Sequence, residues 1–521
     1  MAEFKEKTLK RYAAAVERKK VEDLKKNYIY VCPRRYPDGG ETKAVDEVFD
    51  STGIDATSTK VGKQHNQIFP PFHEWVDPVP TIRIPEAEEH RWEKYKKQLK
   101  ELLHKALEIS NFHEVIEDVL TDNLIAEGAL ALYVGEPECP FVFEAVDWDM
   151  FFTEEDYEGR PQTVFVRNDM TLDKIRYKWR KAEIPKELED LSENSDRVFE
   201  VVACYLYDIW HDNYTYQVWL TDGERLLWEK KSVPTSPLIV FRINKRMRRS
   251  VGYGPVQDVL PNIQTSNYVQ KLILQNAAFA VSGLWQTEDN GVINAANTVL
   301  RPGAIIPKEV GSKGLEPLEV NRNFDVSQFI LTDQQNKIRE QIMGNTLPQI
   351  KDGVRSASEY AYRQQEKNDR EIPAALKVSY SQNALLKRMY AILTSPQMKA
   401  SPYFIEPFSY TVEGRVTPVK VKIKAANPLI SMQLEADSDN SLNTYATARQ
   451  IFGGVAETMV KHVDYCHRFL MDKGFDPEFL EELDVAKQNY EAFQQEQREL
   501  AAAELSEQKA ENGGSGKSRT R

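Results

Sequence analysis

The stretch that decides the fold is SVGYGPVQDVLPNIQTSNYVQKLILQNAAFAVSG, residues 250–283. Gly252 and Gly254 permit a tight, close-packed entry, and Pro255 suits the first turn of a helix because a proline nitrogen needs no intrahelical partner there. Apolar residues then recur at spacings of three and four, at Val256, Leu260, Ile263, Val269, Leu272 and Ile273. This period predicts one long helix, with a kink or a late start at Pro261 in its second turn.

The same stretch leaves open what the helix packs against. Ala277, Ala278 and Ala280 make one face small enough for the close approach of another helix. Lys271 is the only charged side chain between residues 259 and 287. The stretch is short for a membrane span, and periodicity by itself favours a core helix over a helix packed between subunits.

Composition limits the class of protein. The chain has 521 residues, of which 41% are hydrophobic, which is enough for several domains with cores of their own. The formal net charge of -12 argues against a surface that coats nucleic acid everywhere, so any contact with DNA is expected to be local. The four cysteines form no CxxC or Cys/His cluster, which predicts neither zinc nor a disulfide scaffold and fits a reducing compartment. We expect neither export nor a membrane partner.

Upstream of this helix, the sequence predicts helices and then sheet. Residues 5–26 show a charged helical pattern, and residues 32–85 are rich in Pro, Gly, Asp and Thr, which predicts an extended connector. Residues 86–131 predict a second amphipathic helical region. Short β-branched and aromatic runs over residues 130–244 predict a mainly antiparallel sheet, interrupted by a helix at 171–191.

Two short motifs close this region. LTDGERLLW predicts a hairpin in which Asp222 and Gly223 supply the positive φ of a tight turn. INKRMRR forms a basic patch just before the long helix, made by Lys245, Arg246, Arg248 and Arg249, with Arg242 just upstream. Such a run is most often a solvated or acid-paired face, with contact to phosphate as the alternative.

Downstream, the pattern is insertion, returning helix, loop and long helix. Residues 284–325 are rich in Gly, Pro and Asn, and residues 326–343 then predict a helix. Residues 344–356 form a polar loop, and the long helix that follows to residue 393 is expected to kink near Pro373. The apolar side of the returning helix is expected to carry Phe329, Ile330, Ile338 and Ile342.

The C-terminal part changes pattern twice. Residues 403–423 alternate again and predict strands that rejoin the earlier sheet. Residues 431–474 predict a helical bundle, residues 477–511 one acidic helix, and residues 512–521 a flexible tail. The whole chain is therefore expected to be α+β.

The sequence predicts no catalytic, cofactor or metal site. GYGP lacks both the GK[ST] ending and the GxGxxG spacing of phosphate loops. Asp147 and Asp149 in VDWDMF imitate the paired carboxylates of a two-metal nuclease, although such residues at a sheet edge are usually turn and capping groups. Three further carboxylates lie nearby, Glu154, Glu155 and Asp156. His462 and His467 are five residues apart, which does not place them on one helix face. A metal-dependent nucleic-acid enzyme using Asp147 and Asp149 stays as the rival hypothesis.

Three blocks, in this order and spacing, resemble the head-to-tail connector, or portal, proteins of short-tailed double-stranded DNA phages of the podovirus type. They are GYGPVQDVLPNIQTSNYVQKLILQNAAFAV, RPGAIIP and GVRSASEYAYRQQE. The likeness is strongest over residues 237–392 and elsewhere follows the order of elements and the overall length. The tyrosine-rich EYAYRQQE departs from the more acidic version of the family.

The resemblance implies a non-enzymatic ring, usually of twelve subunits, at one capsid vertex of the virion. Such rings assemble in the host cytoplasm, and their channel passes double-stranded DNA during packaging by a terminase and during ejection through the tail. A tail adaptor protein and the capsid and scaffolding proteins are the other implied partners. A tail adaptor ring protein is a further alternative.

The resemblance also implies an elongated α+β subunit with named parts. These are a wing at 1–249 and 357–430, stem helices at 250–283 and 326–343, a clip at 284–325, a tunnel loop at 344–356, a helical crown at 431–511 and a tail at 512–521. Stem packing would involve Leu260, Ile263, Leu272, Ile273 and Ala277. The tunnel loop would carry Gln349, Lys351, Asp352 and Arg355, and the clip Arg301, Lys308 and Lys313. A stem helix is buried largely by its neighbours in the ring, which reverses the preference for a core helix.

Overall fold

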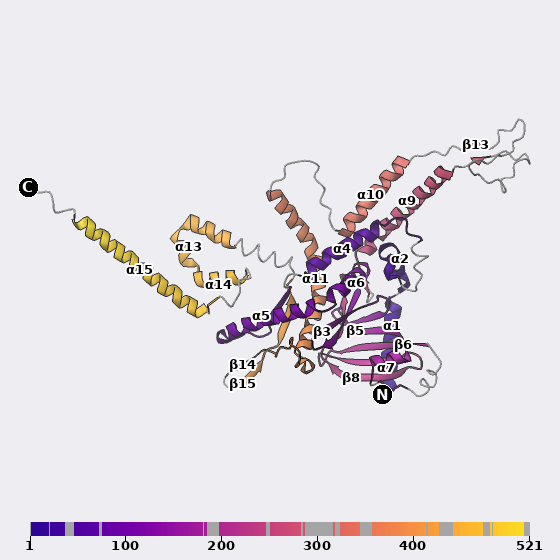
Figure 1. Cartoon of the computed structure of the whole chain (residues 1–521), viewed down its shortest axis with the longest axis horizontal. Helices are drawn as coiled ribbons and strands as arrows, with labels where there is room; N and C mark the ends of the chain where they lie inside the picture. The colour runs from indigo at the N-terminus through magenta and orange to yellow at the C-terminus, as the bar shows by residue number, and fades with distance from the viewer. Residues whose placement is uncertain are drawn as a thin grey trace, which may run out of the picture. The chain divides into compact units, whose positions relative to one another are not determined.

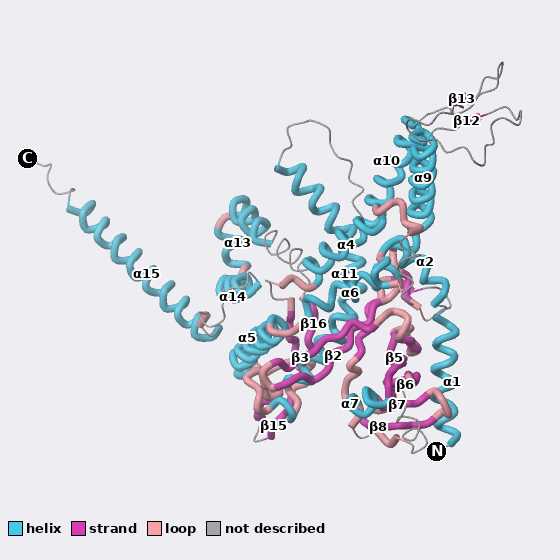
Figure 2. The backbone as a smooth tube through the Cα atoms, turned by 45° about the vertical axis from the view of Figure 1, so that its right-hand side comes forward, coloured by secondary structure: helices cyan, strands magenta, loops and turns pink. Residues whose placement is uncertain are grey.

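The computed structural model describes residues 2–19, 21–36, 46–71, 75–180, 182–184, 197–245, 251–282, 285–286, 316–317, 324–343, 357–412, 415–426, 441–472, 480–481 and 483–514. Its fold is α+β, as predicted, with long helices and antiparallel sheets (Figures 1 and 2). The first of two compact units comprises Met1–Asn66, Asn111–Tyr133 and Phe143–Ser381, and the second Gln67–Ser110, Val134–Val142 and Gln382–Arg521. No described helix is long and apolar enough to cross a membrane.

The N-terminal part is helical over the predicted charged region and also over part of the predicted connector. The charged region forms α1 (Ala2–Lys19) and α2 (Val21–Val31), followed by the short 3-10 helix η1 (Pro33–Arg35). The predicted connector is wrong over α4 (Thr52–Ile68), which is helical. Its polar sequence hides a buried stripe, Ala56, Val61, Gln64 and Ile68. Prolines lie in the flanks of this segment and not inside it, so a composition average over the region misses the helix.

The second predicted helical region forms two helices. These are α5 (Glu86–Glu108) and α6 (Phe112–Ile125). The region ends earlier than expected because β2 (Gly128–Glu136) begins directly after α6. This strand lies in a three-stranded sheet of order β3-β2-β9, with β3 (Cys139–Val146) and β9 (Leu238–Phe241).

The largest sheet has five antiparallel strands in the order β4-β5-β6-β7-β8. They are β4 (Phe151–Glu155), β5 (Pro161–Thr171), β6 (Val198–Asp208), β7 (Asn213–Leu220) and β8 (Arg225–Val233). Strand side chains alternate between its two faces. One face packs in a core that includes α1 through Leu9 and Tyr12. The other packs in a core that includes α7 (Leu172–Lys178) through Leu172 and Ile175.

Two local predictions in this sheet need correction. The helix expected at 171–191 ends at Lys178, and the chain there turns so that Trp179 Nε1 donates to Tyr216 Oη at 2.7 Å. Residues 185–191 lie outside the described part. In the predicted hairpin, the positive φ values belong to Gly223 and Glu224 and not to Asp222.

The strands predicted over 403–423 do not rejoin the earlier sheet. β14 (Ser409–Val412) pairs with β15 (Arg415–Pro418), and β16 (Val421–Ala425) pairs with β1 (Val76–Pro80). Strand β1 lies in the segment predicted as a connector. Its two prolines are tolerated because a strand with one partner needs no N–H donors on its other edge.

The stretch that opened the sequence forms α9 (Val256–Ser282), which contains Pro261 and lies beside α10 (Phe324–Met343) in both views (Figures 1 and 2). Its entry is a short ladder between β10 (Asn244–Lys245) and β11 (Gly252–Tyr253). Beyond the helix pair, β12 (Trp285–Gln286) pairs with β13 (Glu316–Pro317). The predicted long helix is α11 (Ala357–Leu393), with Pro373 inside it, and the 3-10 helix η2 (Pro396–Met398) follows.

Most of the described C-terminal residues are helical, as expected. Residues 441–452 are helical, and α13 (Gly454–Met459) and α14 (His462–Asp472) follow. The acidic helix is α15 (Leu483–Gly514), drawn in yellow in Figure 1. The expected tail at 512–521 therefore begins inside this helix, and residues 515–521 lie outside the described part.

Candidate functional site: the paired helices and their root

The entry to α9 is pressed against the end of α6. Gly252 N–H donates to the Glu127 carboxylate, Oε2, at 3.0 Å. A Cβ added at Gly252 would lie 2.4 Å from the backbone oxygen of Ala126, and one added at Gly254 would lie 2.0 Å from that of Leu124. Backbone cannot move aside as a flexible side chain can, so only glycine fits at either position.

A buried group of charges surrounds the same carboxylate. Lys19 Nζ lies 3.3 Å from Glu127 Oε1, and Arg242 Nη2 lies 2.9 Å from Glu127 Oε2. Arg242 also reaches Glu155 at 2.7 Å. The side chains of Lys19 and Glu127 are 2% and 1% exposed. Buried charges tolerate the loss of water only when each is paired, so these four side chains depend on one another.

The pKa shifts follow from this burial. Burial lowers the pKa of Lys19, against the opposing charge of Glu127. Burial by itself would raise the pKa of Glu127, but the neighbouring cations Arg242 and Lys19 outweigh it and the net shift is downward. Glu127 is therefore a carboxylate. Lys19 is further held by the backbone oxygen of Phe151, which accepts from Nζ at 2.7 Å.

The described end of the predicted basic patch is acid-paired. Lys245 Nζ pairs with Glu155, the carboxylate that also binds Arg242. The other predicted members, Arg246, Arg248 and Arg249, lie outside the described residues. Of the two interpretations of this run, the acid-paired one holds for Lys245.

A polar strap, residues 47–53, holds the middle of α9. The side chain of Asn267 accepts from the backbone N–H groups of Phe49 at 2.6 Å and Asp50 at 3.0 Å, and its amide donates to the Glu47 oxygen at 2.9 Å. Ser266 Oγ donates to Asp50 Oδ2. The amide of Gln335, on α10, donates to Asp50 Oδ1 at 3.2 Å. Asp50 thus ties both helices of the pair to the strap.

α9 and α10 lie side by side. Ile263 on α9 is buried, and among the described side chains of α10 a stripe of Leu331, Ile338 and Ile342 is buried. Asn262 Nδ2 donates to Gln341 Oε1 at 2.8 Å across the pair. The predicted apolar side of α10 is wrong for Phe329 and Ile330, which are 77% and 46% exposed. Leu331 starts the stripe instead, since it lies seven residues before Ile338, two helical turns away.

We call residues 256–267 of α9 the root and residues 268–278 its outer half. Of the predicted stem-packing residues, Leu260 and Ile263 lie in the root, half-buried and buried respectively. Leu272, Ile273 and Ala277 lie in the outer half, where Leu272 is 40% exposed. The outer half also exposes Tyr268 and Leu274.

The predicted loop and clip residues cannot be placed. Gln349, Lys351, Asp352 and Arg355 lie outside the described residues, as do Arg301, Lys308 and Lys313.

The carboxylates that the rival hypothesis would use each make a contact of their own elsewhere in the subunit. Asp147 pairs with Arg35 at 3.4 Å, and Glu154 accepts from Arg11 Nε at 2.9 Å. Asp156 accepts backbone N–H groups of its own turn, and burial raises the pKa of Asp149. Within the described ranges, no group of three or more His, Cys, Asp or Glu side chains is placed to hold a metal ion.

Sequence reasoning missed Lys19, Glu127 and the Asp50 strap. A signal was present for Glu127 and for the strap. Glu127 is a lone charge in LIAEGALAL, and Ser266 and Asn267 interrupt the apolar pattern of α9. A polar residue inside an apolar run is a candidate for a buried hydrogen-bonded group.

The described part of the chain is thus an α+β subunit with a pair of long helices whose entry is fixed by close backbone packing and buried ion pairs. The chain belongs to the bacteriophage head to tail connecting protein family, whose model matches residues 5–476. As a member, it is a phage head-to-tail connector, or portal, protein.

Two solved structures are similar to the chain at 12% sequence identity. One is a chain of the "virion of native gene transfer agent (GTA) particle", with 80% of this chain and 94% of that chain covered and a TM-score of 0.36. The other is a chain of the "neck of empty GTA particle computed with C6 symmetry", with 77% and 90% covered and a TM-score of 0.34. A search of curated proteins gave no match.

Proposed function

We propose that this connector protein forms a ring, of twelve subunits, at one capsid vertex, and that double-stranded DNA enters and leaves the capsid through its channel. The observation that carries the proposal is the exposure of large apolar side chains on the outer half of α9 and on the first turns of α10. Tyr268, Leu272 and Leu274 on α9 and Phe329 and Ile330 on α10 are exposed in the subunit. A cluster of large apolar side chains on a folded protein marks a surface that a partner covers.

The partner is a second copy in a ring. A helix of 27 residues is about 40 Å long, enough to line a stalk. Its entry is fixed inside its own subunit by Glu127 and its root by Asp50, while its outer half offers Ala277 and exposed apolar side chains to a neighbour. We therefore assign α9 and α10 as the stem helices.

The remaining parts follow from the family resemblance. We assign residues 1–249 and 357–430 to the wing, 284–325 to the clip that meets motor and tail, 344–356 to a tunnel loop and 431–511 to the crown. In this assignment the protein is not an enzyme. It docks a terminase and a tail adaptor protein, contacts capsid and scaffolding proteins, and is assembled in the host cytoplasm into the virion.

Charge supports a channel in which DNA slides. A net charge of -12 weakens attraction to the phosphate backbone, and a few cations on the tunnel loop, such as Lys351 and Arg355, make transient contacts. Replacing both with Ala should alter DNA packaging or retention while rings still assemble. Unchanged genome filling and retention would count against this role.

Negative-stain microscopy of the purified chain tests the ring. Particles with a central hole support the proposal, and a protein that stays monomeric while cleaving DNA with magnesium supports the rival enzyme. Pull-down with the terminase then separates a portal from a tail adaptor ring, since only the portal should retain the motor protein.

A further inference from the structure

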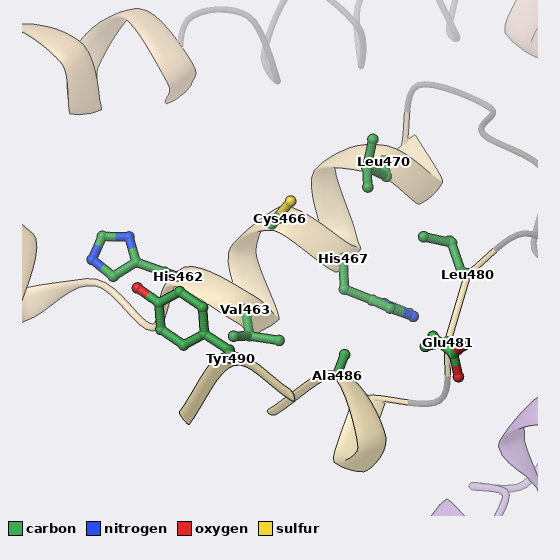
Figure 3. A pocket seen from close by; sticks show the side chains of 9 residues that line it. All are labelled: His462, Val463, Cys466, His467, Leu470, Leu480, Glu481, Ala486 and Tyr490. Carbon is green, nitrogen blue, oxygen red and sulfur yellow. The ribbon is translucent and has the colours of Figure 1, made fainter. Parts of the chain in front are cut away.

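A pocket of about 330 Å³ lies between α14 and α15 (Figure 3). Val463 and His467 point from α14 toward Ala486 and Tyr490 on α15, and Leu470 and Leu480 close one end. The two helices are joined beside it by the ion pair of Asp464 with Lys487 at 2.9 Å. Its lining is mostly apolar, with Glu481 at its exposed edge.

The same region carries an apolar knob, which we define as Ile451, Phe452, Val455 and Met459. These side chains are 66%, 64%, 63% and 81% exposed. The 441–452 helix contacts α14 through its first two turns, where Ser441 hydrogen-bonds Tyr465 at 3.1 Å and the rings of Tyr445 and Tyr465 lie 6.2 Å apart. Its last turn and α13 leave the knob exposed.

We infer that this pocket receives the knob of a neighbouring copy of the chain. The inference rests on the proposed ring and names a contact that closes it. Pocket and knob are different surfaces of one chain, so the contact is head-to-tail, which is the type of contact that generates rings. A pocket of about 330 Å³ is in the size range that encloses small ligands and admits an aromatic side chain such as that of Phe452.

Charge fixes the orientation of this contact. Arg449 precedes Phe452 by three residues and therefore lies on the same side of its helix, and Glu481 lies at the pocket. Insertion of the knob brings these opposite charges together, which favours this register over others.

Cross-linking between neighbours tests the contact, because the native Cys466 lines the pocket and is exposed. The variant is Val455→Cys, in a chain that also carries Cys139→Ser so that this half-buried thiol cannot react. A short bis-maleimide added to the rings should give a ladder of dimers and higher oligomers on a denaturing gel. Adding Cys466→Ser should abolish the ladder. Leu442→Cys, at the start of the 441–452 helix and ten residues before Phe452, is the matched control and should give none.

Several outcomes overturn the inference. Rings that image normally but give no ladder overturn it and leave the proposed function standing. A cross-link confined to single chains overturns it as well, because the knob then reaches the pocket of its own subunit. A chain that forms no rings in any condition overturns both this inference and the proposed function.

A second measurement does not depend on cross-linking. Phe452→Ala should raise the protein concentration needed for half-maximal ring assembly about tenfold, as loss of a central anchor does. Tyr157→Ala is the control, since Tyr157 is 83% exposed on the β4–β5 turn and lies outside the knob. Equal assembly of the two variants overturns the inference, provided that both keep the thermal midpoint of the parent chain.

Discussion

The root and the outer half of α9 belong to one continuous helix but differ in what covers them. In the root, Val256 and Ile263 are buried within the subunit, and Asn267 is hydrogen-bonded to the strap. In the outer half, Tyr268 and Leu272 are 60% and 40% exposed, although the apolar pattern continues. An apolar period shows that a helix face is covered. The buried polar groups show which part of that face is covered by its own chain.

The largest expected effect is on the entry to α9, from Glu127→Gln. This change leaves Lys19 and Arg242 with one carboxylate fewer in a buried site, and we expect a loss of about 3–5 kcal/mol in the free energy of unfolding. Urea unfolding of the unassembled subunit measures it. Glu158→Gln, which breaks the exposed pair with Arg160, should cost less than about 1 kcal/mol. Equal losses would show that the entry to α9 is not organised by this carboxylate.

The next effect is on the strap, from Asn267→Leu. Two backbone N–H groups, of Phe49 and Asp50, lose their acceptor, and we expect a loss of about 2–3 kcal/mol by the same measurement. Asn262→Leu removes only the exposed bond to Gln341 and should cost about 1 kcal/mol or less. A larger loss at Asn262 would contradict the role of the strap in holding the middle of α9.

A third, smaller effect concerns pH. Asp122, on α6 beside Tyr28 and Arg35, is buried, and burial raises its pKa to about 6 against the opposing charge of Arg35. Because the folded state then holds a proton that the unfolded state has released, this group lowers stability as pH rises from about 4 to about 6. The slope is at most about 1.4 kcal/mol per pH unit.

Asp122→Asn should remove this contribution. The difference in unfolding free energy between parent and variant should therefore change between pH 4 and 6.5 and be constant above that range. Asp118→Asn, a partly exposed neighbour that also pairs with Arg35, is the control and should leave the slope unchanged. If the unfolding free energies of the parent and of Asp122→Asn change in parallel with pH, the raised pKa of Asp122 is refuted.

The smallest effect on the subunit is expected in the outer half. Leu272→Ala together with Ile273→Ala should change the unfolding free energy of the unassembled chain by only about 1 kcal/mol, because neither side chain is fully buried there. Ring assembly should nevertheless weaken. Ile338→Ala, which empties a fully buried position, should cost about 2–5 kcal/mol. If the double variant melts the monomer and leaves rings intact, the outer half is not an assembly surface.

Much of the fold could be predicted from local patterns. The long helices α9, α10 and α11 follow from apolar spacing, and the five-stranded sheet from alternation. The failures have a common cause. In α4 polar side chains such as Thr57, Gln64 and His65 are buried together with the apolar ones, and β1 is a proline-containing strand whose partner β16 is far away in the sequence. Neither can be recognised without the tertiary neighbours.

The site was predictable only in part. The spacing of GYG marks the entry to α9. The contact of its glycines with the carbonyls of Leu124 and Ala126 depends on the tertiary structure and cannot be predicted from the motif. The pairing of Glu127 with Lys19, more than one hundred residues away, is likewise invisible to spacing. The faces of α10 were misassigned because Phe329 and Ile330 are apolar whether a face is turned inward or left for a partner.

The position of Glu127 has a mechanical consequence. One carboxylate holds the amide of Gly252 at the entry to α9, the guanidinium of Arg242 just after β9 and the ammonium of Lys19 at the end of α1. Hydrogen bonds weaken steeply as they lengthen and bend, so such a joint is stiff to small displacements and then yields abruptly. We therefore expect a displacement of α9 along its axis to be resisted first at Glu127, and to load α1 and the strand β9 through the same carboxylate.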